Sequence, residues 1–192
     1  MRDRSGVESS GDLAKLFSST ALQLRSVELG FSNLTQAELL SIRHLTLLRE
    51  LCLMDIEGLT DKVLAELAPK LTSLETLELL SNEKVSHVGI IEFVNQPYRL
   101  SQIISHDNVI VRADAVVAAI AANPHLCRRL TKLLIKGCGE MSLRGVVNPE
   151  TVQALASKCY QLKSLTLPKQ PTPYPEDILR LLRWRSLAFG PI

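Results

Sequence analysis

Aromatic residues are scarce in this sequence, and it has neither a long apolar run nor a large excess of one charge. Phenylalanine, tryptophan and tyrosine together make up 4% of the 192 residues. No apolar stretch approaches the roughly 20 residues that span a bilayer, and the opening MRDRSGVESSGD is polar where a signal peptide is apolar. We therefore expect no membrane insertion and an intracellular protein, in the cytoplasm or the nucleus.

The charges are nearly balanced, with 22 basic and 20 acidic residues and a net charge of +2. A protein whose main task is to hold a polyanion carries a clear basic excess, so we expect no nucleic acid as partner. The hydrophobic fraction of 46% is enough to fill the core of one domain without help from metals or disulfides.

Residues in the spacing that metal sites or catalysis need are also missing. None of the four cysteines stands in a C-x-x-C pair, and no two of the four histidines are four residues apart. We therefore expect no metal and no disulfide, with Cys138 and Cys159 as small buried residues. No phosphate-binding loop, dinucleotide motif or nucleophile elbow occurs. The sequence predicts a protein without cofactor and without enzymatic activity.

Leucine is abundant, and it recurs in the pattern apolar-x-x-apolar-x-apolar. The six copies begin at Leu24, Leu48, Leu74, Leu100, Leu130 and Leu162, at intervals of 24, 26, 26, 30 and 32 residues. Five copies fit in full, and the copy at Leu100 has Ser105 where the last apolar residue is expected. Each copy is typical of a short strand, and a stretch with helical spacing follows it. Such units bury their apolar faces against one another and form a stack.

The unit that begins at Leu48 shows the reasoning for one repeat. Leu48, Leu51 and Leu53 are predicted to point into the core, and the residues between them to face outward. In the helix that follows, Thr60 or Asp61 can serve as the N-cap. Pro69 disfavours helical geometry in the residue before it and so helps to end that helix. In the preceding unit, Thr35 and Glu38 form the sequence signature of a capping box.

The two ends depart from the repeat. We expect a single domain over 1–192, with 1–23 as an N-terminal cap or partial repeat, about six repeats over 24–167, and a proline-rich segment with a capping helix over 168–192. Leu13, Leu16 and Phe17 give the N-terminal helix its apolar face. The C-terminal helix is either a cap or a docking element for a partner, with Trp184 as its anchor.

Three stretches carry a resemblance to a known family: LCLMDIEGLTDKVLAELA, LIKGC ending at Cys138, and ALASKCYQLKSLTL with Cys159. Over residues 13–167 the chain resembles the leucine-rich repeats of the cysteine-containing subclass. The resemblance implies an α/β solenoid of curved strand-plus-helix repeats with a parallel sheet on the concave face. Repeats of this kind form the substrate-binding part of F-box proteins, which recruit targets to ubiquitin ligases. The residues before the repeats are too few for an F-box, so we expect a fragment or a chain without the ligase adaptor.

The outward positions of the predicted strands form the main candidate for a binding surface. Its charge runs from acidic in the early repeats to basic in the later ones, and an apolar strip follows it. The partner-binding candidates are Glu50, Met54, Glu78, Leu80, Ile104, Lys132, Leu134 and Lys136. We expect a protein partner that apolar anchors hold and that the charge gradient orients. The alternative is that these are ordinary strand residues without a partner.

A second candidate surface is the alanine-rich helix over 112–123. Ala118 and Ala122 belong to an outer face that carries alanine where other repeats carry charge. It is either a packing face for another chain or a consequence of the high helix propensity of alanine. Two functions remain: an adaptor or substrate receptor resembling those of ubiquitin ligases, or a structural subunit built permanently into a larger multiprotein complex.

Overall fold

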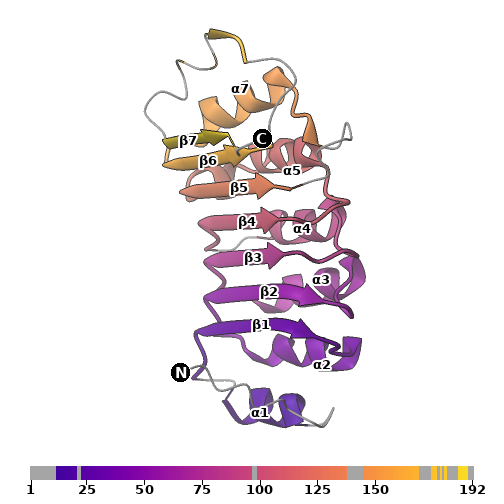
Figure 1. Cartoon of the computed structure of the whole chain (residues 1–192). Coiled ribbons are helices and arrows are strands. Elements are labelled where there is room, and N and C mark those ends of the chain that lie inside the picture. Colours follow the sequence, from indigo (N-terminus) through magenta and orange to yellow (C-terminus); the bar gives the residue numbers. More distant parts are fainter. Residues whose placement is uncertain are drawn as a thin grey trace.

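The computed structural model describes residues 12–20, 23–96, 99–137, 145–168, 174–176, 178, 180 and 186–189. Within these residues the fold is α/β, and one sheet of seven parallel strands follows the order of the chain (Figure 1). The strands are β1 (Ser26–Ser32), β2 (Glu50–Ile56), β3 (Thr76–Leu80), β4 (Gln102–His106), β5 (Lys132–Lys136), β6 (Ser164–Leu167) and β7 (Ser186–Phe189). The predicted α/β class and parallel sheet are confirmed.

The helices form a second layer along one side of the sheet, and neighbours in the chain pack against each other (Figure 1). They are α1 (Asp12–Thr20), α2 (Gln36–Leu40), α3 (Asp61–Leu67), α4 (His87–Val94), α5 (Ala113–Ala122), α6 (Pro124–Cys127) and α7 (Pro149–Lys158), with 3-10 turns η1 (Ser41–His44) and η2 (Ala68–Lys70). None of these described helices is both long and apolar enough to cross a bilayer.

The leucine pattern places the strands correctly. Each of β1 to β6 begins two residues after the leucine that opens a copy of the pattern. In β2, Leu51 and Leu53 are fully buried, as is Leu48 before the strand, whereas Cys52 and Met54 are only partly covered. The period of two along a strand separates these sets onto the two faces of the sheet. The core therefore lies between the sheet and the helices.

The helices begin where the sequence provides caps. Thr35 and Glu38 form the predicted capping box, in which the Thr35 backbone N–H donates to Glu38 Oε2 over 2.7 Å. Hydrogen bonds from the Thr35 hydroxyl and backbone lower the pKa of the Glu38 carboxyl. Thr60 is the cap of α3, and α3 ends at Leu67, two residues before Pro69.

Asp61, the other predicted cap candidate, belongs to the next unit instead. Its Oδ1 atom accepts the backbone N–H groups of Ser86 (2.8 Å) and Gly89 (3.1 Å) at the start of α4. Asp114 repeats this arrangement by accepting the N–H of Asn148, the cap of α7. A carboxylate near the N-terminus of one helix thus satisfies donors at the start of the following helix, and it ties adjacent units together.

Two buried asparagines join the strands at their carboxyl ends. Asn82 Oδ1 accepts the N–H of Ile56 (3.1 Å), and its Nδ2 donates to the carbonyls of Leu53 and Leu80. Asn108 Oδ1 in turn accepts the N–H of Asn82 over 2.8 Å. We call this connected set the asparagine ladder. It satisfies backbone groups that would otherwise be buried without partners.

Ser105, the exception to the leucine pattern, is explained by the same ladder. Its side chain is buried, and its hydroxyl accepts a hydrogen bond from Asn108 Nδ2 over 2.9 Å. A polar residue in this core position therefore costs little, because its hydrogen bond is made inside the protein.

The structure corrects the expected ends of the chain. Leu16 is 49% exposed, so Leu13 and Phe17 alone form the buried face of α1. At the other end the expectation of a capping helix was incomplete, because a seventh strand, β7, pairs with β6. Ile178, within the range expected for the capping helix, is buried, whereas Trp184 lies outside the described residues.

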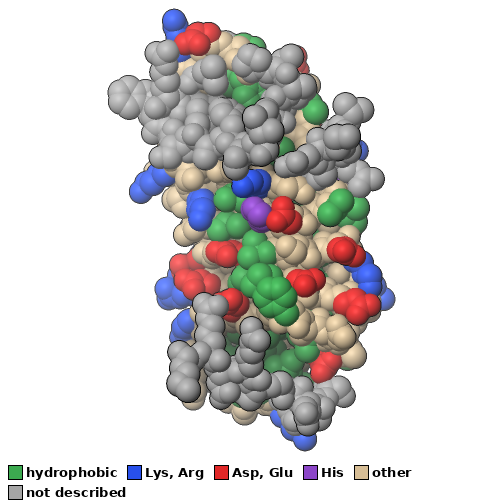
Figure 2. Space-filling view, viewed as in Figure 1, with side chains coloured by type: hydrophobic (Ala, Val, Ile, Leu, Met, Phe, Trp, Pro, Cys, Tyr) green, Lys and Arg blue, Asp and Glu red, His purple; other side chains and the backbone are tan. Residues whose placement is uncertain are grey.

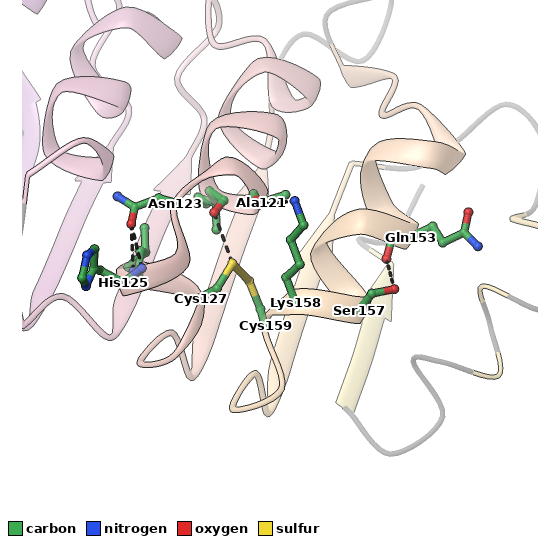
Figure 3. The surroundings of a disulfide bond; sticks show 10 residues. Ala121, Asn123, His125, Cys127, Gln153, Ser157, Lys158 and Cys159 are labelled. Carbon is green, nitrogen blue, oxygen red and sulfur yellow. Dashed lines mark hydrogen bonds between the residues drawn. A yellow bond between two sulfur atoms is a disulfide. The ribbon is translucent and has the colours of Figure 1, made fainter.

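The structure also corrects the interpretation of the cysteines. Cys127 and Cys159 form a disulfide with their Cα atoms 4.2 Å apart (Figure 3). Each stands three residues before the leucine that opens the next strand, at Leu130 and Leu162. Stacked units bring equivalent positions together, and the search for C-x-x-C pairs could not detect a pair one repeat apart. Cys159 is buried as predicted, and Cys138 lies outside the described residues.

Candidate functional site

The face of the sheet opposite the helices carries side chains in three columns, which we call the strand face. The register aligns Glu50, Thr76, Gln102, Lys132 and Ser164 in the first column, Glu28, Cys52, Glu78, Ile104, Leu134 and Thr166 in the second, and Gly30, Met54, Leu80, His106 and Lys136 in the third. Parallel strands lie about 4.8 Å apart, so members of one column are direct neighbours.

All eight residues predicted to bind a partner lie on the strand face. The apolar strip is stepped rather than straight, because Met54 and Leu80 are neighbours in the third column while Ile104 and Leu134 are neighbours in the second. Figure 2 shows hydrophobic side chains gathered along the middle of this face, with acidic side chains on both sides of its lower half. The binding role of these residues remains a prediction.

Ile104 differs from the prediction in one respect. Its side chain is only 8% exposed, although it points away from the helices. Met54, Leu80 and Leu134 are partly exposed and therefore offer more apolar surface than Ile104.

The electrostatics of the strand face change along the stack. Glu28, Glu50 and Glu78 lie on β1 to β3, whereas Lys132 and Lys136 lie on β5. Burial, together with the nearby carboxylates of Glu78 and Glu28, raises the pKa of the Cys52 thiol to about 11. The charge gradient along the strand face follows from the places of these glutamates and lysines on the strands.

His106 lies between the acidic and basic regions, in the third column. Its Nδ1 atom is 2.8 Å from Asp107 Oδ2, and both side chains are partly exposed. This pair lies on β4 and directly after it, near the middle of the sheet.

Phe31 is a surface residue that the sequence analysis missed. It is 75% exposed, the most exposed of the large hydrophobic side chains in the described part of the chain. Its φ angle of 51° lies in the left-handed region, which bulky residues rarely adopt. Asp55, Ser81, Asp107 and Gly137 have the same type of backbone at the equivalent place, seven residues after the leucine that opens each copy. A phenylalanine among these small or polar residues was the signal that could have identified it.

A cavity of about 370 Å³ adjoins Phe31 at the carboxyl ends of β1 to β3. Its lining includes the carboxylates of Asp55, Glu57 and Glu83, with Lys84 as the single cation. Lys84 Nζ lies 3.9 Å from Glu57 Oε1 and also donates to the Glu57 carbonyl over 3.1 Å. Ser32 Oγ, also in the lining, is buried without a hydrogen-bond partner.

The second predicted surface lies on the helical layer. Ala118 and Ala122 are exposed on α5, while Val116, Val117 and Ile120 of the same helix are buried. They do not meet the strand face, and Trp184, the third member of this prediction, is outside the described residues. Nothing in the described ranges groups three or more His, Cys, Asp or Glu side chains as a metal ion would need.

Comparison with known proteins gives no relative. No protein-family model matches the chain, and no curated protein matches it either.

Proposed function

We propose that this chain is a leucine-rich repeat solenoid of the cysteine-containing subclass that binds a protein partner on its concave strand face. It acts without catalysis, as an adaptor or substrate receptor resembling those of ubiquitin ligases. The stack of strands in chain order, each two residues after a pattern leucine, supports the repeat assignment. The buried asparagine ladder and the equivalent left-handed residues support it independently.

The observation that carries the binding role is the alignment of partly exposed apolar residues with charges of opposite sign at the two ends of one face. Met54, Leu80 and Leu134 interrupt an otherwise polar surface, and Glu50 and Lys132 lie in the same column on different strands. Interfaces use apolar side chains as anchors and complementary charges for orientation. Carboxylates over β1 to β3 repel a polyanion, which argues for a protein partner over a nucleic acid.

The test is an affinity pull-down with quantitative mass spectrometry, using wild type and the double variant Leu80→Glu and Lys132→Glu. A matched control carries Val88→Glu and Lys62→Glu, the same chemical changes at exposed positions on α4 and α3. We expect the first variant to lose the partners that wild type and control both retain. Partners that remain bound to the strand-face variant would rule out this surface.

Salt separates the two modes of binding in the same experiment. A receptor that recruits its target through the charged strand face should release it in high salt, because exposed charges are screened within about 3 Å at 1 M ionic strength. A fixed set of partners in constant ratio that survives high salt would instead indicate a structural subunit of a larger complex.

A further inference from the structure

We infer that the acidic end of the strand face binds a basic, extended segment of the partner that carries an apolar side chain. This inference rests on the proposed function and specifies the chemistry of the segment bound there. The surface, which we call the acidic patch, surrounds the exposed side chain of Phe31 and the partly exposed side chains of Met54 and Leu80. It consists of Glu28, Glu50, Glu78, Asp55, Glu57 and Glu83.

Most of these carboxylates are available to a ligand. Within the described residues, Glu28, Glu50, Asp55 and Glu83 make no ion pair and their carboxylates accept no hydrogen bond from a cation. Arg25 and Arg49, which directly precede β1 and β2, are engaged with other groups. Arg49 pairs with Glu75 over 3.5 Å, and Arg25 donates to the carbonyl of Leu47. The Lys84–Glu57 pair therefore neutralises only part of the negative charge of the acidic patch.

The carboxylates lie on both sides of the apolar side chains. Glu50 precedes Met54 on β2 at one end of the strand, and Asp55 follows it at the other end. Figure 2 shows this arrangement as hydrophobic side chains flanked by acidic ones on either side. An apolar side chain with basic residues before and after it complements this surface. A segment that crosses from β1 to β3 covers two strand spacings, which is about 10 Å. About three residues of extended chain have this length.

Phe31 gives the acidic patch its anchor. Its ring is exposed, and its backbone has the left-handed conformation that bulky residues rarely adopt. An aromatic face beside unpaired carboxylates attracts a guanidinium both by its π electrons and by charge. The adjoining cavity of about 370 Å³ is large enough to receive a long side chain beside the ring.

The test uses fluorescence anisotropy with three labelled peptides on the purified chain. The probes are Arg-Arg-Leu-Arg-Arg, Arg-Arg-Gly-Arg-Arg and Glu-Glu-Leu-Glu-Glu, which separate the contributions of charge and apolar contact. We expect the first probe to bind at least about tenfold more tightly than the third and severalfold more tightly than the second, with affinity falling as salt rises. Equal binding of the acidic and basic probes would overturn the inference.

Two variants assign the binding to the acidic patch. Phe31→Asn removes the ring with a residue that tolerates the left-handed backbone, and Glu50→Lys reverses one exposed charge. Glu66→Lys, at an exposed position on α3, is the matched control. We expect both patch variants to lose about fivefold or more in affinity for the first probe, and the control to bind like wild type. Circular dichroism confirms that each variant is folded. Wild-type affinity in both patch variants would refute the assignment.

Failure of this inference is distinguishable from failure of the proposed function. The basic probe could fail to bind while the variant Leu80→Glu, Lys132→Glu still loses its partners in the pull-down. In that case the strand face binds proteins, and the inference that the bound segment is basic is wrong. If partners survive that double variant, the strand face is not the interface, whatever the peptides do.

Discussion

At the scale of single residues, Asn82 stabilises the fold through buried hydrogen bonds to the backbone. It makes hydrogen bonds to backbone groups of its own strand and of the preceding one, and its side chain is 1% exposed. Groups that lose such a partner stay buried and cannot turn to water. Each unsatisfied group then costs about 1 to 3 kcal/mol.

We therefore expect Asn82→Leu to lower the free energy of unfolding by about 3 kcal/mol, because similar volume is kept while the hydrogen bonds are lost. Asn33→Leu, at an exposed position, should change it by less than about 0.5 kcal/mol. Urea denaturation followed by circular dichroism measures both. Equal stability of the two variants would show that the ladder is not required.

Residues of the core were more predictable than residues of the ladder. Leu51 and Leu53 follow from the period of the pattern alone, because burial is decided within one strand. The role of Asn108 was not predicted, since its partners Leu79 and Asn82 stand in the preceding unit. Phe31 was missed for a related reason, because its exposure depends on a left-handed backbone at the end of β1.

At the scale of elements, the disulfide connects α6 to the turn that follows α7. Figure 3 shows Cys127 and Cys159 between these segments, with Lys158 extending to Ala121 of α5. Lys158 Nζ donates to the Ala121 carbonyl over 3.0 Å, near the C-terminal end of α5. This part of the helical layer thus has a covalent and a charged connection between the same two units.

We expect a disulfide that closes a loop of 32 residues to stabilise the fold by about 3 to 4 kcal/mol. Reduction should lower the free energy of unfolding of the wild type to that of the double variant Cys127→Ser and Cys159→Ser, and should leave the variant unchanged.

A thiol assay in denaturant without reductant provides the control for the disulfide itself. At most two of the four cysteines should react, because Cys127 and Cys159 are oxidised. Four reactive thiols would contradict the bond.

Among the elements, β7 was the one that sequence reasoning missed. Trp184 stands two residues before β7 as Leu162 stands before β6, and Leu187 and Phe189 complete the same apolar-x-x-apolar-x-apolar pattern. The copy was overlooked because an aromatic residue opens it and the four preceding prolines suggested the end of the stack. The alternation of strand and helix before it was predictable, because leucine and alanine recur there with the period of a strand and then with the period of a helix.

At the scale of the whole molecule, each strand pairs only with its neighbours in the chain. A unit in the middle of such a stack is covered on both sides, whereas a terminal unit is covered on one. Stability in arrays of this kind is approximately a sum of terms within units and between neighbours. It should therefore decrease from the middle of the sheet toward both ends.

Hydrogen exchange followed by mass spectrometry tests this expectation. The backbone N–H groups of β3 and β4 should exchange most slowly, and those of β1 and β7 faster by about tenfold or more, because fraying begins at the ends of the described sheet. The double serine variant should speed exchange in α6 and α7 without affecting β2. Uniform protection across the sheet would show that the stack unfolds as one unit.

The asparagine ladder links residues 26 positions apart, the interval that also separates β2, β3 and β4 in register. Each strand in this part of the sheet therefore pairs with equivalent neighbours on both sides. These contacts are the same however many further units the stack contains. An in-frame copy of one such coding segment would lengthen the stack by a strand while interrupting a single contact surface. The middle of the molecule is in this sense open to growth by gene duplication, whereas the longer units that contain β5 and β6 are not interchangeable with it.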